Sequence, residues 1–469
     1  MLNRDIAVQK CEIPDEQPMI FLLFLHPESK IPLSLTRSVV FPIIKLSTKQ
    51  YIHMDLFAKF ENRLGPIGDY AEKAPGYFAF PKLEGEIGNR MKFQAKEKII
   101  WSLNNYLGLA NHPEVRKADA EAAAKYGLAS PMGARMMSGN SDLHLQLEKE
   151  LAAFVGKEDA MLFNFGYQGM VSTIDTLCGR HDVVVYDAES HACIIDGLRL
   201  IPSHRYVYKH NDIADCDKQL ARATEMVKKT GGGILVITEG VFGMSGNQGK
   251  IKELAVLKEK YQFRLFVDDA HGFGTMGKTG AGIGDEQDCM DDIDIYFSTF
   301  AKSMASIGGF LAADKKILTF LRYNMRSQIY AKSLPMAFVA GNLKRLDLLR
   351  TKPELREKLW HNVRRLQDGF RERGFDLGTS NTPVTPVFMK GGLYDAVQLT
   401  FDLRENYDIF CSVVVYPVIP KGQIELRIIP TAAHTDQDID ETLAAFSAIR
   451  EKLENKLYPQ EMPQVGVPA

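Results

Sequence analysis

Long apolar runs are missing from this 469-residue chain. The longest near the start, MIFLLFL at residues 19–25, is far shorter than the ~20 apolar residues that a membrane-spanning helix needs. It follows the acidic stretch EIPDEQP, whereas a signal peptide opens with basic residues. We therefore expect no transmembrane segment and no secretion signal. No strongly basic amphipathic helix stands out either, so membrane contact is expected to be peripheral at most.

Paired cysteine motifs and a strong net charge are also absent. The six cysteines are scattered, with no CxxC pair and no neighbouring histidine cluster. This pattern indicates reduced intracellular thiols rather than a disulfide framework or a zinc site. The formal net charge of -2 gives no electrostatic argument for nucleic-acid binding. We therefore expect a cytoplasmic protein without a metal site or a nucleic-acid partner.

The first 53 residues differ from the rest, with several prolines and no helical period. We expect an irregular extension there, a candidate non-native segment. Met54 is a candidate true start, because MDLFAKFENRLGPIG opens an amphipathic helix. The length predicts two or three domains. The expected order is the extension at 1–53, an N-terminal arm at 54–96, a large domain at 97–345, a C-terminal α+β domain at 346–458 and a flexible tail at 459–469.

Helical and strand patterns alternate from about residue 97. HPEVRKADAEAAAKYG and SDLHLQLEKELAAFVG place apolar residues at helical spacing and end at glycine. Five short apolar runs lie among such segments, namely DAMLF, DVVVYD, GGILVITEG, YQFRLFVDDA and DIDIYFSTF. The predicted fold class is therefore α/β, with a mostly parallel central sheet and helices on both faces. After residue 345 a long charged helix, further apolar runs and a final helix predict a smaller α+β domain.

A glycine-rich stretch, GFGTMGKT at residues 272–279, matches both the phosphate-loop pattern and, in its first six residues, a dinucleotide pattern. Both motifs need a helix directly after the loop, whose N-terminal amides hold the phosphates. The following TGAGIGDEQD carries three more glycines, and each costs about 1 kcal/mol relative to alanine in a helix. We therefore interpret this stretch as a structural loop.

One lysine, Lys302 in STFAKSMASIGGF, has no obvious acidic partner. A buried ammonium is costly, so such a lysine pairs, reaches solvent, or becomes a neutral amine or imine. Ligands of doubly wound sheets bind beyond the carboxyl ends of the strands. The residues expected at that edge are Lys302, Thr299, Asp268, His271 and His191, with Gly166 and Tyr167 at a helix N-terminus and Arg427 from the C-terminal domain.

These residue types together fit one cofactor, pyridoxal 5'-phosphate (PLP). Lys302 would form a Schiff base with its aldehyde, and Asp268 would keep its pyridine nitrogen protonated, which makes the ring an electron sink. His191 would stack on the ring, and His271 would reach the ring oxygen. Singly, each has an ordinary interpretation: a surface lysine, a core histidine, or, for VDDAH, capping acids or a two-carboxylate metal site. The combination in this chain order points to the cofactor.

The chain from about Trp101 to His434 resembles the α-oxoamine synthase family of fold-type-I PLP enzymes. The motifs that carry the resemblance are SLNNYLGLANHPEV, YGLASPMGARMMSGNSDLHLQLEKELAAF, ESHACIIDG, VDDAHGFGTMGKTGAG, STFAKSMASIGGF and IYAKSLPM. The resemblance implies Lys302 as the Schiff-base lysine, Asp268 as the pyridinium partner, His191 on the ring and His271 at its oxygen. It further implies that Gly166, Tyr167 and Thr299 serve the phosphate, and that Asn104 and Arg427 hold the substrate carboxylate. Family members are homodimers with shared sites, in which YAKSLPM would reach the neighbouring phosphate.

Several positions depart from the family pattern. Ala301 replaces a usual serine before the lysine, and Ala331 stands where a hydroxyl is common, so two phosphate donors are missing unless Lys332 or Ser333 compensates. Asn105 stands where many members have aspartate. Asn247 and Gln248 stand where an aspartate commonly follows glycine. These changes bear on cofactor affinity and substrate identity more than on the class of reaction.

The implied reaction is a decarboxylating condensation of an amino acid with an acyl-CoA, catalysed by Lys302, His191 and Asp268. KSMASIGGF is most similar to the serine palmitoyltransferase version of this loop, which favours a long-chain acyl-CoA, lipid (sphingolipid) biosynthesis and a small amino acid. Serine is the first expectation, and cysteate and glycine are further donors. The alternatives are glycine C-acetyltransferase, 8-amino-7-oxononanoate synthase and a fold-type-I aminotransferase. A non-catalytic subunit is disfavoured because Lys302 is present.

Overall fold

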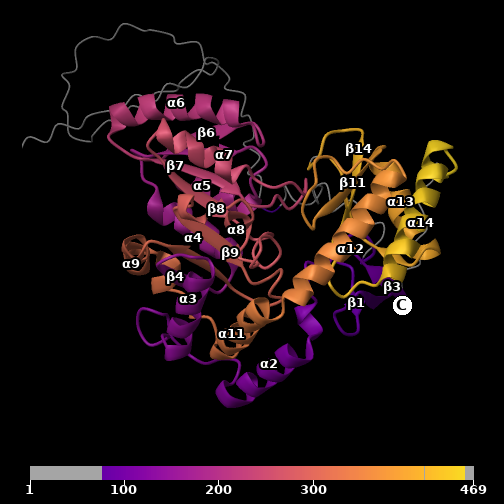
Figure 1. The fold of residues 1–469 in the computed structure, drawn as a ribbon, viewed down its shortest axis with the longest axis horizontal. Helices are drawn as coiled ribbons and strands as arrows, with labels where there is room; N and C mark the ends of the chain where they lie inside the picture. The colour runs from indigo at the N-terminus through magenta and orange to yellow at the C-terminus, as the bar shows by residue number, and fades with distance from the viewer. Residues whose placement is uncertain (1–56, 58–75, 417, 460–469) are drawn as a thin grey trace, which may run out of the picture. The chain divides into compact units, whose positions relative to one another are not determined.

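The computed structural model describes residues 57, 76–416 and 418–459 (Figure 1). The chain divides into two units, Met1–Leu64 and Gly65–Ala469, and the account below concerns the described residues of the second. The expected extension at 1–53, the candidate start at Met54 and all but the first residue of the expected tail lie outside the described residues. The expected domain boundaries therefore stay predictions.

A seven-stranded sheet forms the centre of the second unit. Its strand order is β4 (Asp159–Phe163), β10 (Gly309–Ala313), β9 (Ile295–Thr299), β8 (Arg264–Asp268), β7 (Ile234–Glu239), β5 (Val183–Asp187) and β6 (His204–Tyr208). The pairs from β9 to β6 are all parallel, whereas β10 pairs antiparallel with both β9 and β4. The five expected strands are present, and the predicted mostly parallel sheet is confirmed.

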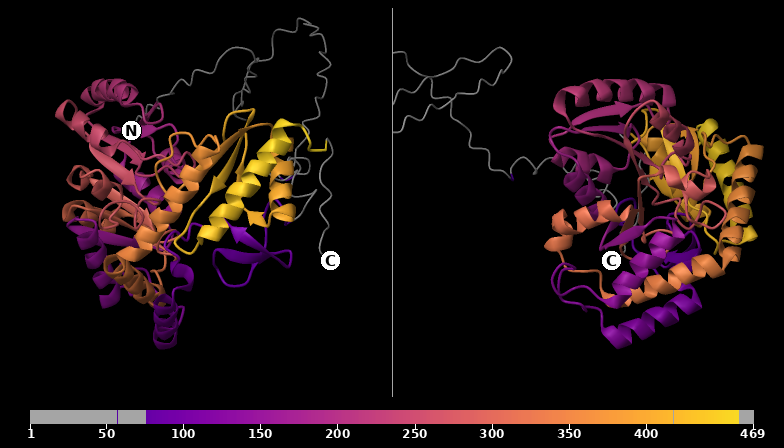
Figure 2. Two further views of the ribbon diagram at one scale, coloured as in Figure 1. Left: turned by 45° about the vertical axis from the view of Figure 1, so that its right-hand side comes forward. Right: turned by 60° about the vertical axis from the view of Figure 1, so that its left-hand side comes forward.

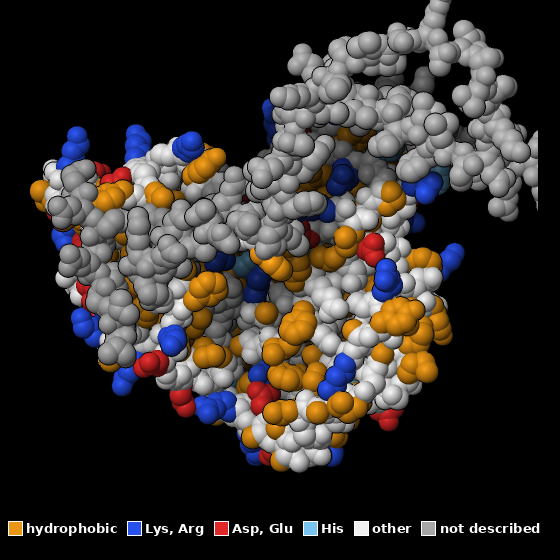
Figure 3. Space-filling model, turned by 180° about the vertical axis from the view of Figure 1, so that it is seen from behind, with side chains coloured by type: hydrophobic (Ala, Val, Ile, Leu, Met, Phe, Trp, Pro, Cys, Tyr) orange, Lys and Arg blue, Asp and Glu red, His pale blue; other side chains and the backbone are white. Residues whose placement is uncertain are grey.

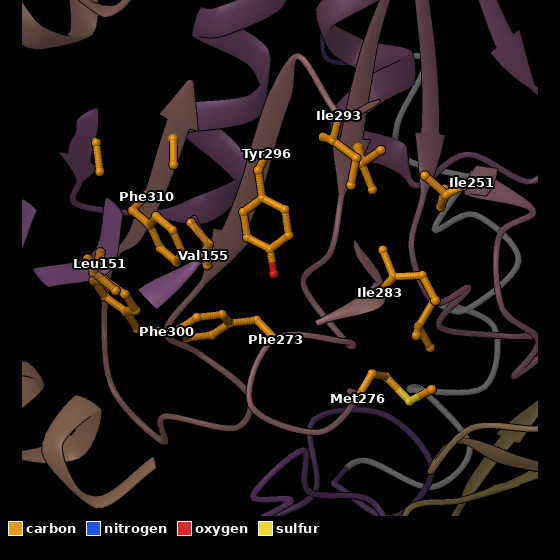
Figure 4. Packing of buried hydrophobic residues seen from close by; sticks show 14 of the residues in the cluster. Leu151, Val155, Ile251, Phe273, Met276, Ile283, Ile293, Tyr296, Phe300 and Phe310 are labelled. Atoms are coloured by element: carbon orange, nitrogen blue, oxygen red, sulfur yellow. The ribbon is translucent and has the colours of Figure 1, made fainter. Parts of the chain in front are cut away.

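Helices cover both faces of this sheet, as the alternation of buried residues along the strands requires. Val184 packs into a core with α4, α5 and α9, whereas its neighbours Val183 and Val185 pack into a core with α3, α6 and α11. Figure 4 shows part of the second core, where Tyr296 and Phe310 from the sheet meet Phe273 and Phe300 from the loops. These helices are α3 (Asp142–Phe154), α4 (Gly166–Leu177), α5 (Ala192–Leu200), α6 (Ile213–Thr230), α9 (Lys315–Asn324) and α11 (Met336–Thr351).

Helix α2 and six short helical segments complete the surroundings of the large sheet. They are η2 (Leu109–Asn111), α2 (Pro113–Tyr126), α7 (Ile251–Val256), η3 (Leu257–Glu259), α8 (Ile283–Glu286), η4 (Met290–Asp292) and α10 (Arg326–Ile329). The glycine stretch at 272–279 forms turns, and the next helix, α8, has four residues and begins at Ile283. No helix follows the loop directly, in agreement with the structural-loop interpretation.

The C-terminal part has its own core. A three-stranded antiparallel sheet of β11 (Thr385–Lys390), β14 (Gln423–Ile428) and β13 (Ser412–Val414) packs against α12 (Pro353–Glu372), α13 (Leu393–Asn406) and α14 (Asp436–Glu454). Ile424, Leu426 and Ile428 belong to this core, so Arg427, which alternates with them, lies on the opposite sheet face.

The N-terminal strands join this C-terminal part. Strands β1 (Leu83–Glu84), β2 (Arg90–Phe93) and β3 (Lys96–Ile100) form a sheet with β12 (Ile409–Phe410), which pairs parallel with β3. Figures 1 and 2 show these indigo strands beside the yellow C-terminal elements. None of the helices in the described part of the chain is long and apolar enough to cross a membrane.

Candidate active site

The site lies at the carboxyl ends of three neighbouring parallel strands. Asp268 is the last residue of β8, Glu239 is the last residue of β7, and the two are paired in register. Lys302 follows Thr299, the last residue of β9, by three positions. Because parallel strands end at a common edge, these groups converge there, as the sequence predicted for Asp268 and Lys302.

Lys302 is held close to acidic groups without an ion pair. It forms no salt bridge with any described residue, although Asp268 and Glu239 are near enough to act on it. Burial of the amine lowers the pKa of Lys302, the two carboxyl groups oppose that shift, and Arg427 adds to it. More of this amine is therefore neutral than in an ordinary lysine. A neutral amine is the form that attacks an aldehyde and accepts a proton.

The Asp268 carboxyl group is buried and positioned from two sides. One oxygen accepts a hydrogen bond from the Ala270 N–H at 3.1 Å, and the other lies 3.9 Å from Cys193 Sγ. Cys193 Sγ also lies 3.0 Å from His191 Nδ1, so this thiol stands between the two predicted cofactor residues. Burial raises the pKa of Asp268, and the neighbouring Lys302 and His191 lower it.

His191 is the N-cap residue of α5 and is only partly buried. Its Nδ1 accepts a hydrogen bond from the Cys193 N–H at 3.3 Å. The backbone N–H of His191 donates to Glu239 Oε1 at 2.6 Å. The Tyr167 ring meets it edge to face at 6.2 Å between centroids. Burial lowers the pKa of His191, which favours the neutral imidazole.

Glu239 is a site residue that the sequence analysis missed. It is 6% exposed, and burial, then the nearby Asp268, raise its pKa well above the usual range. A protonated Glu239 still accepts the His191 N–H bond while adding no negative charge beside Asp268. The sequence did contain a signal for this residue, because Glu239 is a carboxylate near the carboxyl end of the mostly apolar run GGILVITEG.

His271 is buried and is held by a second missed residue, Tyr106. The Tyr106 hydroxyl lies 2.7 Å from His271 Nδ1. The other ring nitrogen, Nε2, faces Gly243, where a Cβ would collide with it. Burial, then the charge of Lys302, lower the pKa of His271 well below its usual range, so the imidazole is neutral.

The N-terminus of α4 meets the end of β9. A Cβ on Gly166 would lie 2.9 Å from Thr299 Cβ, so only glycine allows this approach. The free N–H groups of the first helical turn therefore lie beside the Thr299 hydroxyl, an arrangement that suits a phosphate. Tyr167 follows Gly166, and its hydroxyl donates to Asp196. Thr299 Oγ1 donates to the Gly308 carbonyl at 3.0 Å.

Two further predicted residues have unused polar groups. Arg427 donates from Nε to the Gly243 carbonyl at 2.6 Å, and its terminal nitrogens bond to no described residue. Asn104 Oδ1 is buried and has no hydrogen-bond partner. An unpaired buried amide oxygen, a lysine amine without a salt bridge and terminal guanidinium nitrogens without a described partner fit a polar ligand in this space. The residues present therefore fit PLP with an amino acid.

At Ala301 and beside Ala331, where the family pattern places hydroxyl donors to the phosphate, most of the neighbouring polar groups hydrogen-bond within the protein. Ala301 donates its N–H to Thr299 Oγ1 at 3.2 Å. Ser333 uses both its N–H and its hydroxyl on the Gly133 carbonyl, each at 2.9 Å. The Lys332 side chain is exposed, and its carbonyl accepts from Asn164. Of the two expected substitutes for the donor lost at Ala331, only Lys332 has a side chain free for an anion.

The remaining departures from the family pattern have structural roles. Asn105 Oδ1 accepts the Ala110 N–H at 3.2 Å within a local turn. Asn247 bonds to His210 at 3.0 Å and to Thr379 at 3.1 Å, so it bridges the β5 side of the large sheet and the C-terminal part. The Gln248 N–H donates across the same boundary to Asn381 at 3.1 Å.

Known proteins share both the fold and these motifs. Residues 96–446 match the family model described as aminotransferase class I and II. A cysteate-C-fatty acyltransferase from Capnocytophaga ochracea is 62% identical over 86% of this chain and 96% of its own. A Bacteroides ovatus serine palmitoyltransferase is 36% identical over 80% and 94% of the two chains. The chain belongs to the α-oxoamine synthase family.

Solved structures agree. A serine palmitoyltransferase from Sphingomonas wittichii superposes with a TM-score of 0.79 at 28% identity, over 86% of this chain and 100% of the other. A PLP-bound one from S. paucimobilis gives 0.77 at 29% identity, over the same shares. As an α-oxoamine synthase, the protein is a PLP-dependent C-acyltransferase of the serine palmitoyltransferase type, with an amino acid and an acyl-CoA as substrates. The predicted family, fold class, cofactor and reaction class are confirmed.

Proposed function

We propose that this enzyme condenses cysteate with a long-chain acyl-CoA. The observation that carries the proposal is the 62% identity, over almost the full length of the relative, to a cysteate-C-fatty acyltransferase. Serine, the first expectation from the sequence, is the second candidate, supported by the 36% identity to serine palmitoyltransferase. In the reaction the amino acid α-carbon loses its proton and bonds to the thioester carbonyl carbon, while the C–S bond breaks and CoA leaves as the thiol. The bond between the α-carbon and its carboxylate then breaks, CO2 leaves, and a proton takes its place.

PLP, when bound, supplies an electron-withdrawing ring that acidifies the α-C–H bond of the attached amino acid. Lys302 would hold the cofactor covalently through its amine and, as a free amine, would accept the α-proton of the amino acid. Its lowered pKa favours the neutral form that this step needs. Asp268 would hold the ring nitrogen of the cofactor and keep it protonated.

His191 would cover the cofactor ring and act as a neutral hydrogen-bond donor. Its Nδ1 accepts from the Cys193 N–H, so its proton is on Nε2, where it can reach the developing oxyanion of the thioester. Arg427 and Asn104 orient the substrate carboxylate, Arg427 by a two-pronged hydrogen bond. The first turn of α4 with Gly166 and Tyr167, together with Thr299, would bind the phosphate, and His271 would donate to the ring oxygen.

The active enzyme is proposed to be a homodimer. Apolar side chains are exposed in one loop, with Leu128 67%, Met132 77% and Met137 81% exposed. Figure 3 shows apolar side chains gathered on the lower half of the face seen from behind. The YAKSLPM segment, expected to reach the neighbouring site, is bonded to this loop through Met336 N–H and Ser130 O at 2.7 Å. A second copy covering the loop would therefore place the segment at its neighbour's phosphate.

The protein is also proposed to act in the cytoplasm. The five cysteines in the described residues are all free, as expected in a reducing compartment. Any membrane contact would be peripheral.

The test is CoA release from a panel of amino acids against acyl-CoAs of graded length, with products identified by mass spectrometry. We expect cysteate with a long-chain acyl-CoA to give the highest kcat/KM. Faster release with serine would move the assignment to the second candidate. Keto-acid formation without CoA release would contradict the acyltransferase proposal.

A further inference from the structure

Tyr106 and His271 form an isolated pair between distant parts of the sequence. Tyr106 is 0% exposed and comes from the turn that carries Asn104, whereas His271 follows β8. Their hydroxyl and Nδ1 are 2.7 Å apart, and the rings meet edge to face with centroids 6.0 Å apart. Among the described residues, neither side chain has another hydrogen-bond partner. The direction of this one bond therefore decides where the imidazole proton is.

The direction follows from which group has a proton to give. Burial raises the pKa of the Tyr106 phenol, so the hydroxyl keeps its proton. If His271 Nδ1–H donated instead, the phenol proton would be left without an acceptor, which costs about 1–3 kcal/mol for a buried group. Tyr106 is therefore the donor and Nδ1 the acceptor. A neutral imidazole with an accepting Nδ1 carries its proton on Nε2.

Nε2 faces the site. It has no partner among the described residues, and it lies against Gly243, whose carbonyl accepts from Arg427 at 2.6 Å. Lys302, Arg427 and His191 are near enough to lower the pKa of the imidazole. Because residue 243 is a glycine, no side chain there covers the edge of the His271 ring that carries Nε2. The Nε2 hydrogen therefore lies on the ring edge away from Tyr106, in the field of the Lys302 and Arg427 charges, and has no acceptor among the described residues.

We propose that Tyr106 is a positioning residue that fixes His271 as the Nε2–H tautomer, so that His271 serves as a permanent hydrogen-bond donor to the cofactor oxygen. His271 then takes no part in proton transfer. This inference rests on the proposed function for the contact between His271 and the cofactor. The tautomer is measured from the NMR signals of His271 itself, so the result does not depend on which amino acid or acyl-CoA is the substrate.

The experiment is NMR of the PLP-loaded enzyme labelled with carbon-13 and nitrogen-15 in histidine. The His271 signals are identified by their loss in His271→Gln. We expect a neutral Nε2–H ring in the wild-type enzyme from about pH 6.5 upward, because burial holds the pKa of His271 well below its usual range. An Nδ1–H ring or a titrating ring would overturn the proposal, without requiring any Tyr106 variant to fold.

Tyr106→Phe then tests the cause. We expect a mixture of tautomers, an altered pH dependence of the bound-cofactor absorbance and a PLP Kd about fivefold higher, as for one lost hydrogen bond of ~1 kcal/mol. The matched control is Tyr77→Phe, which removes another fully buried phenol that donates to Glu405 at 3.0 Å in the C-terminal part. The control should leave the absorbance unchanged. If Tyr106→Phe keeps a pure Nε2–H ring and the wild-type spectrum, Tyr106 does not set the tautomer.

Discussion

Glu239 and Asp268 end adjacent parallel strands in paired positions, and both carboxyl groups are buried beside Lys302. Two ionised carboxylates buried side by side would repel each other, so only one of the two is expected to carry a charge. Glu239 is the member of the pair that keeps its proton, because burial and the nearby Asp268 raise its pKa well above the usual range. Asp268 is then the group that stays ionised for the cofactor nitrogen.

Replacing Glu239 separates its two possible roles. Glu239→Gln keeps an oxygen for the His191 N–H at 2.6 Å and should retain activity within about threefold. Glu239→Ala leaves that buried N–H unpaired, which costs ~1–3 kcal/mol and should lower kcat/KM by roughly tenfold or more. Steady-state kinetics and the cofactor absorbance measure both. Equal losses in the two variants would indicate that an ionised Glu239 is required.

Replacing Arg427 tests substrate orientation. Arg427→Lys keeps the charge but loses the planar fork, so we expect the KM for the amino acid to rise by about 10–100-fold, as for a charge-assisted bond of ~1.5–3 kcal/mol. The KM for the acyl-CoA should change little. The control is Arg365→Lys, at an exposed pair with Asp440. A rise confined to the acyl-CoA KM would assign Arg427 to the other substrate.

The contact between Gly166 and Thr299 tests the phosphate site. Gly166→Ala places a Cβ 2.9 Å from Thr299 and forces α4 away from β9. Overpacking of this kind costs ~1–3 kcal/mol, so the PLP Kd should rise roughly tenfold or more. Gly179→Ala, whose Cβ has an ordinary 3.7 Å contact, is the control. Unchanged PLP affinity in Gly166→Ala would exclude this helix end as the phosphate site.

His434 gives a prediction for stability. Its ring stacks on Trp101 at 3.8 Å, its Nδ1 accepts the Thr431 N–H, and burial lowers its pKa to about 4. Because the unfolded pKa is near 6.5, the unfolded chain binds more protons between these values. The neutral ring's contribution is therefore complete above pH 6.5 and is lost as pH falls toward 4, by up to about 3 kcal/mol.

Urea unfolding of the wild type and His434→Gln across this range measures the effect. The variant should show a smaller fall in unfolding free energy at acidic pH, and parallel curves for the two proteins would contradict the assignment.

The parts of the fold that the sequence did not predict have identifiable causes. Strand β6 has mostly exposed residues at an edge, so HRYVY shows no apolar run. Helix α13 buries Gln398, Asp402 and Arg404, and these polar residues obscure its period. Arg404 is stabilised there by the aromatic ring of Phe410, with the guanidinium 4.0 Å from its centroid.

The candidate site was predictable where a residue ends a strand. Asp268 and Thr299 end adjacent strands and Lys302 follows Thr299 by three positions, so the topology alone brings them together. Tyr106 was missed because its role depends on a contact with His271, 165 positions away. Cys193 was missed because its thiol acts only through its placement between His191 and Asp268.

The most direct test of the account is borohydride reduction of the PLP-loaded enzyme, followed by peptide mapping. Reduction fixes the cofactor to the amine that carries it. The account predicts one labelled peptide per chain, with the pyridoxyl group on Lys302 and none on Lys332. Label on another lysine, or no label while PLP is bound, would contradict the assignment of Lys302 and the mechanism built on it.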